Sequence, residues 1–256
     1  MARHRFGLLL IATLLGAPGG ECLAAAPAID LPHAYYYSEM YLPQLTSGPS
    51  SVAWSPDSRE VVYSMAGSLW RQRTDATRAV QLTDGPGYDY QPDWSPDGCC
   101  IVYTSGNAQA SELWLLEVRS GRSVQLTHDG AVNLEPRWSP DGQRIVFVDG
   151  RTPLGIWSAP LNAQTAPRRL STLATFAVHF GKPGELVFGA EDKDGSPGIF
   201  RIGEDGSDLQ RMTDTPNMIA FDASRDGRFV IVQDAEQWGS LKLYPATYRL
   251  VASGQA

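Results

Sequence analysis

The stretch WSPDG at residues 94–98 decides the fold, because the chain repeats it. It returns unchanged at residues 138–142, and WSPD stands at residues 54–57. Degenerate copies are FGKPG at residues 180–184 and ASRDG at residues 223–227. A second mark, an apolar residue followed by Thr or Ser, closes each unit, at residues 45–46, 82–83, 126–127, 170–171 and 212–213. Both marks recur roughly every 40–45 residues, which is the period of a four-stranded repeat.

One unit shows how these marks produce strands. In residues 95–98, Pro fixes φ, Asp accepts from backbone amides and Gly takes the positive φ that follows a type I turn, which predicts a hairpin. Apolar strands follow at residues 101–104 and 113–118, and a last strand ends at the second mark. We therefore predict an all-β protein, a β-propeller of about five visible four-stranded blades over residues 47–253, which is either a five-bladed propeller or a shortened or open relative of a six-bladed one. The third strand of the fifth unit is expected at residues 241–243.

Composition excludes some function classes. Hydrophobic residues make up 43% of the 256 residues and charged residues 19%, which gives enough apolar surface for a folded core. The net charge of −7 leaves no basic stripe for phosphates, so nucleic acid is not expected as a partner.

The N-terminus has the order of a secretory signal. Arg3 and Arg5 precede an apolar run of ten residues at 6–15, which is too short to span a bilayer, and alanines follow at 24–26. We expect residues 1–26 to be a signal peptide, residues 27–46 an N-terminal strand or extension, and the mature chain to be periplasmic or secreted without a membrane span. A buried N-terminal helix is the alternative. The context of Cys22 does not resemble a lipoprotein attachment site.

The sequence offers no catalytic constellation. Its four histidines do not pair at metal-ligand spacing, and the chain has no Gly-x-Ser-x-Gly motif. Residues 191–196 resemble the start of a calcium loop but lack the glutamate that would complete it. Cys99 and Cys100 are adjacent, so they form an unlikely disulfide and a poor metal site. We predict no catalytic residues, no metal, no cofactor and no enzyme activity.

Polar residues on the first strand of each unit are the candidate binding residues. The residue before the Trp or its equivalent faces the channel of a propeller, and strand alternation adds further positions to the same face. The candidates are Asp89, Gln91, Asp93, Asn133, Glu135, Arg137, His179 and Asp222. They could bind a ligand, or they could satisfy one another between blades. Asp89, Asp93 and Glu135 with backbone carbonyls could alternatively hold calcium.

An aromatic cluster lies ahead of the repeats. It consists of Tyr35, Tyr36, Tyr37 and Tyr41. This cluster is either a patch for a partner or a strand that packs on the last blade.

The repeated marks WSPDG, IV followed by Tyr or Phe, and LT resemble the WD40-like repeats of TolB-type propellers over nearly the whole mature chain. Residues 35–46 (YYYSEMYLPQLT) and 87–94 (GYDYQPDW) also resemble the N-terminal propeller of certain exported amidohydrolases, over about residues 35–150. The first resemblance implies an exported, non-catalytic module that binds a protein or peptide in the cell envelope. The second implies a truncated or sensor portion of a propeller-amidohydrolase, a metal-dependent hydrolase system.

Overall fold

A computed structural model describes residues 49–107, 109–150, 154–161, 167–214, 218–223, 229–234 and 247–252. All of these residues belong to one compact unit, Pro43–Ala256. Within the described ranges the regular structure is entirely β-strand, as predicted. The predicted signal peptide (1–26) with Cys22, the extension (27–46) and its tyrosine cluster lie outside the described residues.

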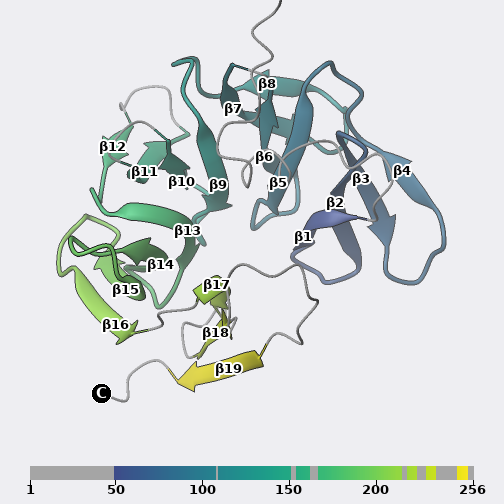
Figure 1. The fold of residues 1–256 in the computed structure, drawn as a ribbon. Coiled ribbons are helices and arrows are strands. Elements are labelled where there is room, and N and C mark those ends of the chain that lie inside the picture. The colour runs from purple at the N-terminus through teal and green to yellow at the C-terminus, as the bar shows by residue number, and fades with distance from the viewer. Residues whose placement is uncertain are drawn as a thin grey trace, which may run out of the picture. The chain divides into compact units, whose positions relative to one another are not determined.

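Four antiparallel sheets of four strands follow one another along the chain, and the strands of each pair in chain order (Figure 1). The first contains β1 (Ser50–Trp54), β2 (Glu60–Met65), β3 (Ser68–Arg73) and β4 (Ala79–Gln81). The second contains β5 (Tyr88–Trp94), β6 (Cys100–Gly106), β7 (Ser111–Glu117) and β8 (Ser123–Gln125). The third contains β9 (Asn133–Trp138), β10 (Arg144–Asp149), β11 (Gly155–Pro160) and β12 (Arg168–Arg169). The fourth contains β13 (Ala174–Phe180), β14 (Glu185–Glu191), β15 (Pro197–Gly203) and β16 (Gln210–Asp214).

A fifth sheet has three described strands, β17 (Met218–Ala223), β18 (Phe229–Asp234) and β19 (Thr247–Ala252). The strand that pairs with β18 on its outer side is β19. The expected third strand at residues 241–243 lies outside the described residues. Each first strand packs against the next, in the order β1, β5, β9, β13 and β17. The sheets are therefore the blades of a β-propeller, in agreement with the predicted fold class.

The Ser-Pro-Asp mark forms the predicted turn between the first and second strands. Gly98 N donates to Ser95 O at 2.9 Å, and the φ of Gly98 is 71°. The Asp97 carboxylate accepts from Ser95 Oγ at 2.6 Å and from Cys99 N at 3.0 Å, and Cys100 N donates back to Ser95 Oγ at 2.9 Å. These contacts recur in the other two copies, at residues 55–60 and 139–144. Serine and aspartate thus close the hairpin, which explains why both recur.

In the first two blades the Leu-Thr mark ties the end of the blade to its third strand. Leu82 N donates to Leu69 O at 2.8 Å, and Leu69 N donates to Thr83 Oγ1 at 2.9 Å. In the second blade Leu126 and Thr127 make the same two contacts with Leu113, at 2.7 and 2.9 Å. The hydroxyl therefore continues the strand ladder beyond the last main-chain pair.

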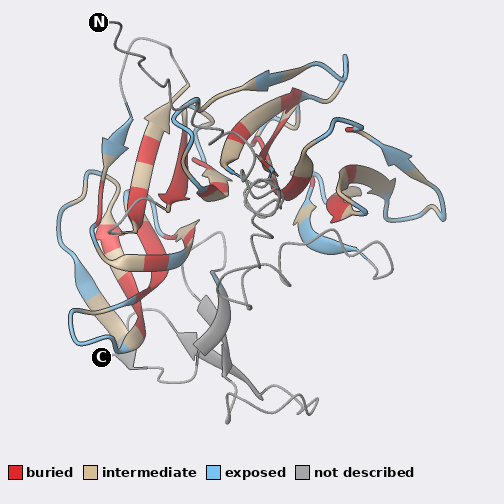
Figure 2. Cartoon of the chain, turned by 45° about the horizontal axis from the view of Figure 1, so that its top comes forward, coloured by how far each residue is buried: buried red, intermediate tan, exposed pale blue. Residues whose placement is uncertain are grey.

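The core lies between successive blades: the hydrophobic clusters combine residues of neighbouring sheets, and the buried residues lie along the strands, red in Figure 2. Trp94 packs with Val62 and Leu69 of the preceding blade, and Trp138 packs with Val102. Burial therefore differs between repeated tryptophans: Trp94 is 3% exposed and Trp138 9%, whereas Trp54, in the first described blade, is 58% exposed.

Hydroxyl groups also join neighbouring blades to each other. Ser64 Oγ of β2 donates to the main-chain oxygen of Asp89 in β5 at 2.6 Å. Thr104 Oγ1, at the corresponding place in β6, lies 3.4 Å from the main-chain oxygen of Asn133 in β9. In both cases the acceptor belongs to the backbone of the next first strand. Among the described residues there is no helix with the length and hydrophobicity required to cross a membrane.

Candidate functional site

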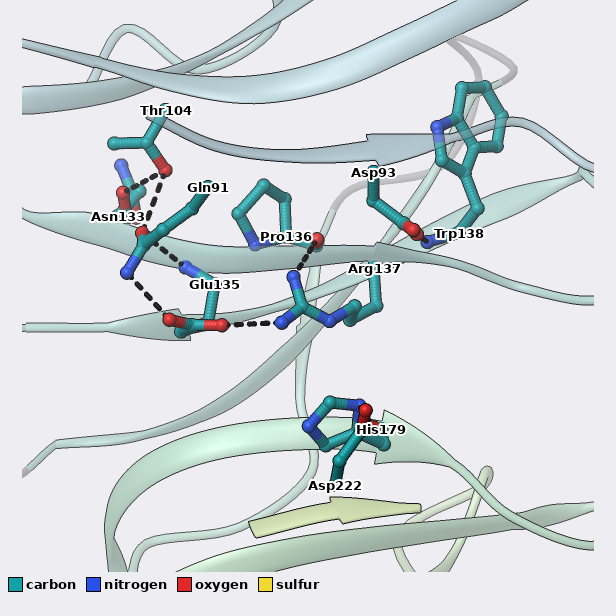
Figure 3. A network of polar contacts seen from close by, with 10 residues as sticks. All are labelled: Gln91, Asp93, Thr104, Asn133, Glu135, Pro136, Arg137, Trp138, His179 and Asp222. Carbon is teal, nitrogen blue, oxygen red and sulfur yellow. Dashed lines mark hydrogen bonds and ion pairs between the residues drawn. The ribbon is translucent and has the colours of Figure 1, made fainter. Parts of the chain in front are cut away.

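Five polar side chains form a row across neighbouring first strands: Gln91 of β5, Glu135 and Arg137 of β9, His179 of β13 and Asp222 of β17 (Figure 3). We call this set the polar row. Because the first strands lie side by side, residues that are about 45 positions apart in the chain come into contact there.

The backbone at Gln91 and Glu135 adopts a conformation that L-residues rarely occupy. Their φ angles are 53° and 52°, and each residue lies at a β-bulge and precedes a proline. Such left-handed residues cost roughly 1–3 kcal/mol each, and they concentrate at functional sites. The proline that follows in each strand is the sequence signal of the bulge, since proline within a sheet marks an edge or a bulge.

These two strained residues bind each other across the blade boundary. Gln91 Nε2 donates to Glu135 Oε1 at 2.6 Å, and Glu135 N donates to Gln91 Oε1 at 3.0 Å. Thr104 Oγ1 donates to the same Gln91 oxygen at 3.3 Å. Sequence reasoning missed Thr104, although a hydroxyl residue in the middle of a second strand, as at Ser64, was the available signal.

Arg137 continues the row and is surrounded by acids. Its Nη2 donates to Glu135 Oε2 at 2.6 Å, and its Nη1 donates to the oxygen of Pro136 at 3.0 Å. Burial lowers the pKa of this guanidinium, but the charges of Glu135, Asp93 and Asp222 outweigh burial, so the net pKa lies above its ordinary value. Arg137 is therefore a permanent cation at the middle of the row.

His179 and Asp222 complete the row. His179 Nδ1 lies 3.3 Å from Asp222 Oδ1, and the two side chains are 15% and 74% exposed. Burial, and secondly the positive charge of Arg137, lower the pKa of His179 to about 3. The imidazole is therefore neutral at pH 7 and lies beside the carboxylate of Asp222.

Asp93, a further predicted site residue, joins two blades. Its Oδ2 accepts from the backbone amide of Trp138 at 2.7 Å (Figure 3). Such a contact fits the second of the two alternatives from the sequence, in which the candidate residues make hydrogen bonds between blades instead of binding a ligand.

Asp89 and Asn133 do not share the face of the other candidates, so the prediction that all eight lie together is wrong. The bulges account for this. In β5, Tyr90 pairs with Thr104 and Asp93 with Val102, so one extra residue separates Asp89 from Asp93 and reverses the alternation. The bulge in β9 has the same effect on Asn133.

Both residues instead lie at the connections between blades. Asp89 is 3% exposed and is hydrogen-bonded to the side chains of Thr83 and Ser105. Asn133 is fully buried, and its Nδ2 donates to Asp129 Oδ1 at 3.0 Å and to Thr127 Oγ1 at 3.3 Å. Each therefore meets the threonine of a Leu-Thr mark.

The described residues contain no group of three or more His, Cys, Asp or Glu that is placed to hold a metal ion. The calcium set considered from the sequence is not assembled, because Asp89 contacts hydroxyls, Asp93 accepts from a backbone amide and Glu135 binds Arg137. Cys99 and Cys100 are free thiols.

The polar row offers charged and hydrogen-bonding groups held in fixed positions, and its imidazole is poorly suited to act as a base at neutral pH. A general base works best when its pKa is near the operating pH. The His179 pKa of about 3 is far below that range, and the Glu135 carboxylate is bound by Gln91 and Arg137.

Comparisons with known proteins agree with the blades. A family model described as the TolB beta propeller domain matches residues 42–166. TolB from Acinetobacter baumannii superposes with a TM-score of 0.68 at 15% identity, over 80% of this chain and 52% of that one. Hydrazine synthase from Kuenenia stuttgartiensis superposes with a TM-score of 0.63 at 12% identity, over 80% and 63%. An oligogalacturonate lyase in complex with manganese superposes with a TM-score of 0.61 at 15% identity, over 75% and 61%.

The chain thus covers 52% of the TolB structure and 63% or less of the two other structures. At these identities the likeness shows the fold, and two of the three neighbours carry the names of enzymes. Comparison with curated protein sequences finds no match.

Proposed function

Because the chain carries a TolB-like β-propeller, we propose that it is an exported, non-catalytic module that binds a protein or peptide of the cell envelope at the polar row. The observation that carries this proposal is the row itself. It spans four neighbouring first strands and carries charges of alternating sign on Glu135, Arg137 and Asp222, which are held by contacts within β9 and between blades.

The exposure of the row suits recognition by a polar partner. Glu135 and Arg137 are 21% and 22% exposed, and Asp222 is 74% exposed. A partner can therefore reach one edge of each group while the other edge stays anchored. Fixed charges of alternating sign favour a complementary charged surface, because like charges placed opposite them are strongly disfavoured.

The absence of catalysis in this proposal rests on the protonation state of the row. A neutral imidazole with a pKa of about 3 takes up a proton poorly at pH 7. The guanidinium of Arg137 is charged throughout and pairs with Glu135. These groups are suited to binding rather than to proton transfer.

A photo-crosslinking amino acid in place of Asp222 tests the binding surface. Expressed in cells with an intact envelope, this variant should trap one defined envelope protein. The same crosslinker in place of Arg73, an exposed residue at the end of β3, is the matched control and should trap none. Added wild-type protein without the crosslinker should compete for the partner and reduce trapping. Added Asp222→Lys protein should not.

Equal trapping from both positions, or none from position 222, would contradict the proposed surface. A panel of amide, ester and uronate substrates tests the non-catalytic part. Turnover that survives repurification would favour the alternative, a portion of a propeller-amidohydrolase system.

A further inference from the structure

A hollow of about 460 Å³ lies at the connection between the first two blades, away from the polar row. One wall is the connecting segment, residues 82–87, and the other is the face of the second blade formed by β6, β7 and β8. We call it the connector hollow. Its volume falls within the range of small-molecule sites, roughly 300–1,000 Å³. It shares no lining residue with the polar row.

Charge in the connector hollow has one sign. Asp84, Asp89 and Glu112 line it, and none of the described lining residues is Lys, Arg or His. Asp89 is 3% exposed, and its side chain meets the hydroxyls of Thr83 and Ser105, which are neutral. A buried carboxylate without a cation is costly, because hydroxyl groups offset only part of the lost hydration.

The hydrogen-bond direction at Asp89 follows from its neighbour. Thr83 Oγ1 already accepts the amide proton of Leu69 at 2.9 Å, so its own proton is available for the Asp89 carboxylate. Glu112 has a corresponding environment at the connection between the second and third blades. There Thr127 Oγ1 accepts from Leu113 N and donates to Glu112 Oε2. The other donors to Glu112 are Gly130 N at 2.8 Å and Asn133 Nδ2 at 3.4 Å, which are also neutral.

Aromatic rings complete the wall, and the opposite side is fixed. Tyr103 and Trp114 are cross-strand partners on β6 and β7 and both line the hollow. Aromatic faces attract cations by roughly 0.5–2 kcal/mol. The connecting segment lies tightly against β6, since a Cβ built on Gly87 would fall 2.3 Å from Ser105 Oγ. The hollow therefore has its shape before a ligand arrives.

We propose that the connector hollow binds a primary ammonium group on a short alkyl chain, with Asp89 as the buried counter-ion and Tyr103 and Trp114 along the chain. Free amines and lysine side chains share this chemistry. The inference does not depend on the proposed function, because the two surfaces are separate.

Calorimetric titration of the full chain with n-pentylamine tests the proposal, with 1-pentanol as the neutral probe of equal length. Pentylamine should bind at least about tenfold more tightly than pentanol. Amide resonances of Gly85 and Gly87, which line the hollow, should shift on titration. Weaker binding of pentylamine as salt rises is also expected, because the rim carboxylate Asp84 is exposed.

Three variants locate the site. Asp89→Asn should weaken pentylamine binding by at least about tenfold. Asp84→Lys places an ammonium group at the exposed rim and should abolish binding, and it decides the matter if Asp89→Asn does not fold. Glu117→Gln is the control. It removes one charge from the exposed end of β7, the strand that carries Trp114, but Glu117 lies outside the hollow, so binding should be unchanged.

Equal affinity for pentanol, no binding of pentylamine at millimolar concentration, or binding that survives Asp84→Lys would each overturn the proposal. Acetyl-Gly-Lys-Gly-amide and cadaverine distinguish the sources. Tighter binding of the peptide supports the hollow as a lysine site, and tighter binding of the diamine supports it as a site for free amines.

Discussion

Two tryptophans at equivalent positions have opposite surroundings. Trp94 is 3% exposed and lies in a cluster with Val62 and Leu69, whereas Trp54 is 58% exposed. Trp94→Ala should lower the free energy of unfolding by about 3–5 kcal/mol, since it leaves a cavity between blades. Trp54→Ala should change it by no more than about 0.5 kcal/mol. Urea denaturation measures both, and similar losses at the two positions would contradict the packing between blades.

The buried histidine makes stability depend on pH. The pKa of His179 is about 3 in the folded chain against 6.5 as its ordinary value, so below pH 6.5 the unfolded chain binds more protons. The contribution of the neutral, buried imidazole to the free energy of unfolding is therefore complete above pH 6.5, and it is lost as the pH falls toward 3. Between pH 7 and pH 5 the loss is about 2 kcal/mol.

His179→Gln should therefore flatten the decline of unfolding free energy between pH 7 and pH 5, measured by denaturation at each pH. His128→Gln, which changes an exposed histidine, is the control and should keep the decline. An unaltered slope in His179→Gln would show that the imidazole is already accessible to protons in the folded chain.

At the scale of elements, the turn of the first blade departs from its copies. Ser58 occupies the place that Gly98 and Gly142 hold in the next two turns, and its φ is 58°. A left-handed residue with a Cβ costs roughly 1–2 kcal/mol in the folded chain. Glycine removes this strain, but it loses more conformational entropy on folding, which offsets part of the gain. Ser58→Gly should stabilise the chain by about 0.5–1 kcal/mol.

Gly98→Ser is the matched reversal and should destabilise the chain by about 1 kcal/mol. A Cβ at Gly98 would meet Pro56 at 3.8 Å, an ordinary contact, so the difference reports backbone strain rather than a clash. Thermal unfolding of both variants tests the pair, and shifts of the same sign would contradict this reasoning.

The elements also show where sequence reasoning succeeds and where it stops. The Ser-Pro-Asp turns are local, so their contacts follow from residue types two positions apart, whereas the Leu-Thr mark recurs in the sequence but its threonine bonds a third strand 14 positions away. The faces of Asp89 and Asn133 were misassigned because simple alternation ignores a bulge. Pro92 and Pro136 are sequence signals of the two bulges. The hydrogen bond between the bulge residues Gln91 and Glu135, however, depends on how neighbouring blades pack, which the local sequence does not specify.

At the scale of the whole molecule, export remains a prediction from the N-terminal sequence. The charged, apolar and small-residue regions appear in secretory order over residues 1–26. The intact mass of protein recovered from outside the cytoplasm should lack about the first 24–26 residues. Recovery of a chain that retains residues 1–15 would contradict both the signal peptide and the proposed location.

The hydroxyl bonds that join neighbouring blades place a chemical requirement on one of the two blades only. Ser64 and Thr104 supply a hydroxyl, which Thr104 shares with the Gln91 side chain of its own blade, but the acceptor that each finds in the next blade is a main-chain oxygen, which every amino acid carries. The first strand of the next blade can therefore exchange any of its side chains without removing the acceptor. Duplicated units joined in this way are free to diverge, which fits a chain whose architecture matches other proteins at only 12–15% identity.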